Sequence, residues 1–188
     1  LLTNVVLPTC RAHHLPFSMM IGARKQVNPA LRDAGVSLGH SDNATLEQIC
    51  FEFPDNRYVV SYLSRDTQHE LCVASRKFAN LMPFGCWWFL NSPSIIPEIT
   101  DERLELLGAS FIPQHSDARI LEQVIYKWDH SRRIIANSLT KAYTSLLRDG
   151  WPLTREQIER DVTRLFQGNF RQFAGLPAFT SASAAPVS

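Results

Sequence analysis

The stretch RYVVSYLSRDTQHELCVASRKFAN, residues 57–80, holds the repeating unit that decides the fold. Its opening run of apolar residues favours a buried strand. A short polar loop follows, and then Leu71, Ala74 and Phe78 recur at helical spacing. The stretch therefore predicts one strand followed by one helix.

The same unit recurs on both sides of this stretch. PFSMMIG precedes ATLEQICFEF, LMPFGCWWF precedes PSIIPEITDERLELLG, and ASFIP precedes a helical pattern that runs to about Arg148. Alternating strands and helices predict parallel strands with right-handed crossovers, and hence an α/β fold. Four units are half of a (β/α)8 TIM barrel, so either the other half is missing, two copies pair, or the sheet is open and doubly wound.

The rest of the chain adds helix but no second domain. LTREQIERDVTRLFQGNFRQF predicts a further amphipathic helix. We expect one domain over residues 1–175 and a disordered tail over 176–188, where small and polar residues dominate. The opening LLTNVVLPTCRAHHLP resembles a helix entered part-way and does not start with Met, so the sequence is consistent with a piece of a longer protein.

Composition restricts the class of protein without naming its partner. The 188 residues are 45% hydrophobic and 20% charged with a formal net charge of +1, which excludes a disordered chain and gives no reason to expect nucleic acid or an anionic membrane. Four cysteines lie far apart with no CxxC pair, which favours reduced thiols in a cytoplasmic protein. No run of 18 apolar residues and no signal sequence is present, so we expect a soluble protein.

Reactive and cationic residues follow the predicted strands, at the ends where parallel α/β folds bind ligands. Arg24, Lys25, Arg65 and Arg119 would place several cations on one rim, as a carboxylate-bearing or phosphorylated small molecule requires. Each residue alone is explained more simply as an exposed basic side chain on a loop, with no role in binding. The prediction depends on their convergence.

Asp117 and the tryptophan pair have two interpretations each. Asp117 could bind a metal or shuttle a proton, or it could cap the long helix that follows. Trp87 and Trp88 are consecutive, so on a strand one would face the barrel interior and the other the helices. One could line a substrate pocket, or both could serve packing alone. The adjacent His115, Ser116 and Asp117 do not suggest a nucleophilic triad, because triads assemble from distant segments.

These motifs resemble a known family. FGCWWFLNSPSIIPEITDERLELLGASFIPQHSDARILEQVIYKWDHSRRIIA, with upstream PFSMMIGARKQVNPALRDAG and LSRDTQHELCVASRKFANLM, closely resembles the C-terminal half of uronate isomerase (glucuronate isomerase), a divergent member of the amidohydrolase superfamily. The resemblance extends from about Leu15 to Phe173. It implies the C-terminal half of a metal-dependent (β/α)8 TIM barrel with additional C-terminal helices.

The resemblance also implies an activity and roles for residues. The reaction would be aldose–ketose isomerisation of D-glucuronate to D-fructuronate and of D-galacturonate to D-tagaturonate. Asp117 matches the acid that approaches the metal and helps to move a proton, and Arg119 matches the substrate-binding arginine of the D-x-R motif. Trp88 or its neighbour Trp87 matches the aromatic at a strand end, and either Arg24 or Lys25 matches the basic residue after MMIGA.

Two features depart from the family pattern. Many uronate isomerases have LHIGA where this chain has MMIGA with Met20, and the HxH pair that supplies two metal ligands is absent. We therefore expect a divalent metal, in the first instance zinc, whose site is incomplete here, and little activity from this chain alone. The expected partners are a uronate sugar and either a second copy in a homo-oligomer or the missing N-terminal half-barrel. A metal-dependent hydrolase and a non-catalytic half-barrel that binds acidic sugars remain alternatives.

Overall fold

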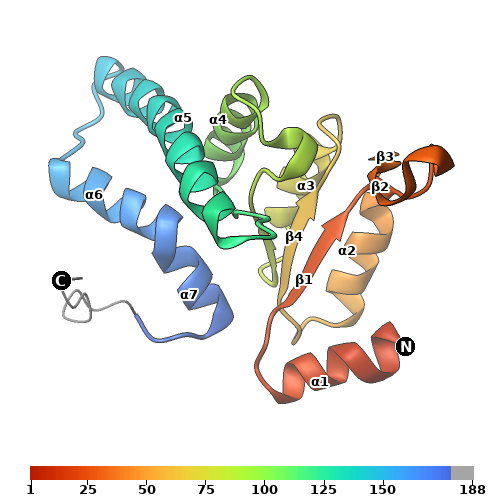
Figure 1. The fold of residues 1–188 in the computed structure, drawn as a ribbon. Coiled ribbons are helices and arrows are strands. Elements are labelled where there is room, and N and C mark those ends of the chain that lie inside the picture. The colour runs from red at the N-terminus through yellow and green to blue at the C-terminus, as the bar shows by residue number, and fades with distance from the viewer. Residues whose placement is uncertain (179–188) are drawn as a thin grey trace, which may run out of the picture.

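The computed structural model describes residues 1–178, which form an α/β fold around a small parallel sheet (Figure 1). Within these residues the sheet has three strands in the order β1–β4–β5, and Phe17 lies opposite Tyr58, which lies opposite Leu81. A parallel bridge between Phe84 and Ile112 extends the sheet by one position. A two-stranded antiparallel hairpin, β2–β3, follows β1.

The elements succeed one another along the chain as follows. The strands are β1 (Phe17–Ile21), β2 (Ala23–Arg24), β3 (Ser37–Leu38), β4 (Tyr58–Tyr62) and β5 (Leu81–Pro83). The helices are η1 (Leu2–Val6), α1 (Leu7–Ala12), η2 (Pro29–Ala34), α2 (Asn43–Glu52), α3 (Gln68–Ser75), η3 (Trp88–Leu90), α4 (Ile95–Leu107), α5 (Leu121–Arg148), α6 (Arg155–Thr163), η4 (Arg164–Gly168) and α7 (Asn169–Ala174).

The two faces of the sheet have different environments. Tyr58, Val60 and Tyr62 of β4 are fully buried in a cluster with apolar residues of α1, α2 and α3. The alternate residues of β1 point the other way, and Ser18 and Met20 there are exposed, Met20 by 40%. Because successive side chains on a strand alternate between faces, β1 packs against helices on one face and is open on the other.

A second apolar cluster lies between α4, α5 and the C-terminal helices. Its buried members include Ile96 and Ile99 of α4, Ile135 and Leu139 of α5, and Leu165 of η4. After α5 the chain turns back at Arg148, and α6 to α7 run in the return direction beside α5 (Figure 1). The long helix is therefore held between α4 and the C-terminal segment.

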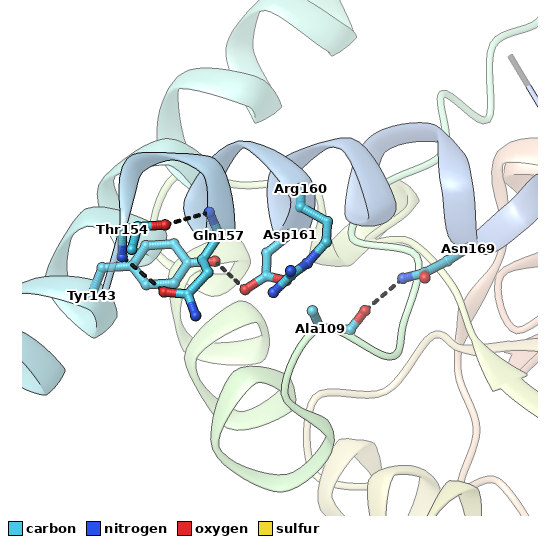
Figure 2. A network of polar contacts seen from close by, with 7 residues as sticks. All are labelled: Ala109, Tyr143, Thr154, Gln157, Arg160, Asp161 and Asn169. Carbon is cyan, nitrogen blue, oxygen red and sulfur yellow. Dashed lines mark hydrogen bonds and ion pairs between the residues drawn. The ribbon is translucent and has the colours of Figure 1, made fainter. Parts of the chain in front are cut away.

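Polar contacts fix the C-terminal segment (Figure 2). Thr154 and Gln157 form a capping box at the start of α6. The Tyr143 hydroxyl donates to Asp161 over 3.3 Å, which joins α5 to α6. Asn169 Nδ2 donates to the backbone oxygens of Ala109 at 2.7 Å and Phe111 at 2.8 Å, so α7 is tied to the chain that leads into the Ile112 bridge.

The structure confirms the predicted α/β class and the alternation of strands with helices. The last unit differs from the prediction, because ASFIP contributes the single bridge at Ile112 and no full strand. The end of α5 at Arg148 and the helical segment after Thr154 are confirmed. Most of the predicted tail, residues 179–188, lies outside the described residues. Among the described helices, none combines the length and apolar character needed to cross a membrane.

Candidate active site

An open cavity of about 1380 Å³ lies where the chain leaves β5 and enters α5. The loop after β5 contributes Trp87 and Trp88, and the loop before α5 contributes Asp117 and Arg119. Residues on the first turns of α5 complete that side, and Asp33 and Ala34 of η2 also reach the cavity. The structure thus brings together four of the residues that the sequence selected.

Asp117 and Arg119 lie in the loop between Ile112 and α5. Asp117 has a left-handed backbone with φ of 42°, and its carbonyl oxygen accepts a hydrogen bond of 2.9 Å from Nζ of Lys127. The backbone N–H of Arg119 donates to Oε1 of Gln123 over 2.8 Å. Among the described residues, no hydrogen bond or ion pair engages the Arg119 guanidinium. Both side chains are exposed, so they are free to meet a ligand.

The capping interpretation of Asp117 is wrong. The N-cap of α5 is Ile120, and no side chain caps this helix. The positive φ of Asp117 belongs to the preceding loop, which Lys127 of α5 holds through the backbone. The Asp117 carboxylate therefore neither caps α5 nor forms another hydrogen bond with the described residues.

The sequence suggested that the two tryptophans lie on a strand, but in the structure they do not. β5 ends at Pro83, Trp87 is extended, and Trp88 has φ of 48° at the start of the short 3-10 helix η3. Trp87 is buried, with 6% of its surface exposed, and its indole N–H has no partner among the described residues. Trp88 is 38% exposed and stacks on Phe89 with ring centroids 4.7 Å apart. The cavity wall is therefore an aromatic turn in which Trp87 is buried and Trp88 is partly exposed.

His115 lies behind this aromatic wall. The sequence assigned it no role beyond a nucleophilic triad, which its adjacency to Ser116 and Asp117 did not support. Its ring is 4.5 Å from that of Phe84 and 6.4 Å from that of Trp87. Burial lowers the pKa of His115 to about 4, with smaller contributions from the positive charges of Arg103 and Lys127. His115 is therefore neutral near pH 7, and within the described part of the chain its Nε2 has no hydrogen-bond partner. No hydrogen bond among the described residues joins His115, Ser116 and Asp117.

Arg65 lies at a different place from Arg119. Its Nε and Nη2 donate to the two carboxylate oxygens of Glu98, each over 2.6 Å. This pairing holds the pKa of Glu98 below its usual range. Arg65 lines a separate cavity of about 580 Å³, together with His40 and Asp66. Its charge is thus already compensated by a carboxylate.

Arg24 and Lys25 lie on the β2–β3 hairpin and its turn, outside both cavities. Both are exposed, and among the described residues neither has an ion-pair partner. The side-chain stem of Arg24 packs over Gly39, where a β-carbon would lie 2.8 Å from Arg24 Cγ. Arg119 and Arg65 thus line different cavities, and Arg24 and Lys25 line neither of these two, although the stem of Arg24 lies against Gly39, which lines the Arg65 cavity.

The described residues do not group into a metal site by themselves. Within residues 1–178, no group of three or more His, Cys, Asp or Glu side chains is arranged to hold a metal ion. In the cavity, the carboxylates of Asp117 and Asp33 have no hydrogen bond or ion pair with other described residues, and a divalent metal needs more ligands than these two. All four cysteines are free thiols, and Cys50, Cys72 and Cys86 are buried.

Comparisons with solved structures identify the relatives of this chain. It is 52% identical to a uronate isomerase from Bacillus halodurans C-125, with a TM-score of 0.89 over 94% of this chain and 42% of that one. A glucuronate isomerase from Caulobacter crescentus matches at 17% identity with a TM-score of 0.78, over 97% of this chain and 40% of that one. A uronate isomerase from Thermotoga maritima matches at 16% identity with a TM-score of 0.75, over 89% and 38%.

The identity to the Bacillus halodurans protein confirms the resemblance drawn from the motifs, and the other two likenesses show the shared fold. The chain spans less than half the length of each of these three proteins. No family model and no curated protein sequence matches it.

Proposed function

We propose that this chain, whose sequence and fold place it with the uronate isomerases, supplies the Asp117 and Arg119 side of an active site for uronate isomerisation. The reaction is the interconversion of D-glucuronate with D-fructuronate and of D-galacturonate with D-tagaturonate. One observation carries the proposal: Asp117 and Arg119 line one cavity with the Trp87–Trp88 turn, and neither side chain is occupied by packing.

The chemistry of the reaction requires groups of these kinds. An aldose becomes a ketose in two stages: the proton on C2 is removed while the C1 oxygen takes up a proton, which gives an enediol, and a proton is then returned to C1 while the C2 hydroxyl loses its proton and becomes the new carbonyl. A carboxylate such as Asp117 can accept the C2 proton and deliver it to C1. A guanidinium such as Arg119 can bind the uronate carboxylate through two parallel hydrogen bonds. The aromatic side chain of Trp88 offers an apolar wall for the carbon chain of the substrate.

The remaining cations differ in how readily they could bind the uronate carboxylate. Arg24 and Lys25 have no ion-pair partner among the described residues, so they stay candidates for the uronate carboxylate if ligand and hairpin approach each other. Arg65 is held by Glu98 and would have to release it before binding substrate. We therefore assign the carboxylate to Arg119 first.

The rest of the site would come from chain segments outside these residues. β1 is an edge strand with Ser18 and Met20 exposed on its open face, and no described strand pairs with its free edge. Such an edge and face are expected to be covered in a stable protein. We propose that this chain is half of a (β/α)8 barrel, and that the complementary half or a second copy closes the sheet and supplies the missing metal ligands. Asp117 would be the one ligand from this chain.

A non-catalytic role is the second candidate. It is favoured by the absence of a metal-ligand group among residues 1–178, because a half-barrel could then hold acidic sugars without turning them over. The two functions are separated by mixing this chain with the part of the Bacillus halodurans uronate isomerase that it does not match and assaying D-fructuronate. Product formation supports the isomerase proposal. Binding of D-glucuronate without product, in a complex shown to form, supports the second candidate.

A further inference from the structure

The geometry points to Gln114 as the positioning residue that holds the aromatic wall of the cavity against the loop that carries Asp117 and Arg119. This inference rests on the proposed function, because the two loops matter together only if they form one site. Gln114 does not line the cavity itself. It acts through the backbone and side chains that it binds.

Gln114 is buried, with 2% of its surface exposed, and both ends of its amide are engaged. Its Oε1 accepts a 2.8 Å hydrogen bond from the backbone N–H of Cys86, the residue before Trp87. Its Nε2 donates to Ser131 Oγ over 2.7 Å, and Ser131 lies on the buried face of α5. One side chain thus connects the aromatic turn, the Asp117 loop and α5.

The position of Gln114 in the sheet explains why a side chain is needed there. The backbone ladder between these segments ends with the bonds from Ile112 N–H to Pro83 O, at 3.1 Å, and from Gly85 N–H to Ile112 O, at 2.8 Å. Beyond these two bonds, no backbone hydrogen bond joins the two loops among the described residues. The Gln114 amide continues the connection by one residue, from the loop before α5 to Cys86.

The amide group suits this place better than other side chains. Gln provides one acceptor and two donors on a planar group, so it can satisfy a backbone N–H and a hydroxyl at the same time. A weaker contact of 3.5 Å reaches Asn91 Oδ1, at the far end of η3. The aromatic turn from Cys86 to Asn91 is therefore held at both ends by the same side chain.

The test compares variants of the full chain by NMR and by ligand titration. Gln114→Met keeps the length of the side chain and removes both hydrogen bonds. The matched control is Asn169→Leu at α7. It removes a buried amide that also makes two hydrogen bonds, one to the backbone oxygen of Ala109, drawn in Figure 2, and one to that of Phe111. The readouts are the exchange rate of the Cys86 amide, the indole N–H signals of Trp87 and Trp88, and the affinity for D-glucuronate.

We expect Gln114→Met to speed exchange of the Cys86 amide, to shift both indole signals, and to weaken D-glucuronate binding by about tenfold or more. Asn169→Leu should lower stability and leave these readouts unchanged. Gln114→Glu should restore binding at about pH 5, because a buried carboxyl is protonated there and again offers one acceptor and one donor. If Gln114→Met does not fold, Ser131→Ala, which removes one anchor, carries the same expectation for the indole signals.

Two results would overturn the inference: indole signals and affinity that do not change in Gln114→Met, or changes of equal size in Asn169→Leu. Failure of the proposed function gives a different pattern. The wild-type chain and its complex with the complementary half would then not bind D-glucuronate, while Gln114→Met would still shift the indole signals. That pattern supports the structural coupling and rejects the proposed substrate.

Discussion

Gly85 approaches His115 so closely that a β-carbon at position 85 would lie 1.9 Å from Cδ2 of the imidazole. Gly85 also has φ of 72°, in the left-handed region that disfavours side chains. We expect Gly85→Ala to lower the free energy of unfolding by about 3 kcal/mol or more, because the overlap adds to a backbone penalty of about 1 kcal/mol. Urea unfolding, followed by tryptophan fluorescence, measures the difference.

Gly150 provides the control for this substitution. Its φ of 82° is similar, but apart from its two chain neighbours no described residue has a heavy atom within 4 Å of the β-carbon that alanine would add. Gly150→Ala should therefore lower the free energy of unfolding by about 1 kcal/mol, which is the backbone penalty alone. Equal losses in the two variants would show that the loops can separate at Gly85, and would contradict the close packing of His115.

Arg119 and Arg65 should differ in their effect on ligand binding. The Arg119 guanidinium has no partner among the described residues, whereas Arg65 is paired with Glu98 through two bonds of 2.6 Å. We expect Arg119→Met to weaken D-glucuronate binding at least tenfold, since a charge-assisted bidentate contact contributes more than about 1.4 kcal/mol. Arg65→Met should change the affinity by less than about twofold. Calorimetric titration of D-glucuronate into each variant, in complex with the complementary half, measures both affinities. A larger loss of affinity in Arg65→Met than in Arg119→Met would place the carboxylate site at Arg65.

The thiols should react with an aromatic disulfide reagent at very different rates. Burial raises the pKa of Cys50 and of Cys72 to about 11, and it raises that of Cys86 as well. A raised pKa keeps these groups protonated below that range, so few thiolates exist at about pH 8. Cys10 is only partly buried and should react first.

The substitution Cys10→Ser identifies the fast thiol. It should remove the rapid phase of the reaction and leave the slow phase, which appears only when the chain unfolds or the pH approaches 11. A rapid phase that survives in Cys10→Ser would mean that one of the three buried thiols is accessible, and that the core around α2, α3 or the aromatic turn opens readily.

Sequence patterns were sufficient to predict the α/β class because apolar residues follow the strands and helices along the chain. In YVVSYL, residues 58–63, every residue is aromatic, aliphatic or small, and in the structure β4 is buried on both faces. Leu71 and Ala74 recur every three residues because one face of α3 meets the same core. The last predicted strand was overestimated because ASFIP has the composition of a strand, but only Ile112 in it forms a bridge, with Phe84.

The site was predictable only in part because its contacts are not local. Asp117 and Arg119 follow the end of a predicted strand, so the rule that parallel α/β folds bind ligands at these ends identified them. The pairing of Arg65 with Glu98 joins residues 33 positions apart, and that of Gln114 with Cys86 joins residues 28 apart, which no local pattern reveals. The Trp87–Trp88 turn was misplaced on a strand because aromatic residues favour strands, while Gly85 and the positive φ of Trp88 end the strand earlier.

One signal in the sequence could have revealed more. A glycine between an apolar run and a pair of tryptophans often marks a bend or a close approach of two backbones. Here Gly85 marks the contact with His115, and the turn that follows carries the aromatic wall. Reading Gly85 as a break would have placed both tryptophans in a loop.

The measurement that tests the central claim most directly is the rate of D-fructuronate formation from D-glucuronate. The assay uses this chain alone, this chain mixed with the complementary part of the Bacillus halodurans uronate isomerase, and the same mixture with Asp117→Asn. We predict no detectable turnover by the chain alone, turnover by the mixture, and a loss of at least about 100-fold in kcat with Asp117→Asn, because the proton-transfer group is removed. Turnover by the mixture that is unchanged in Asp117→Asn would contradict the account.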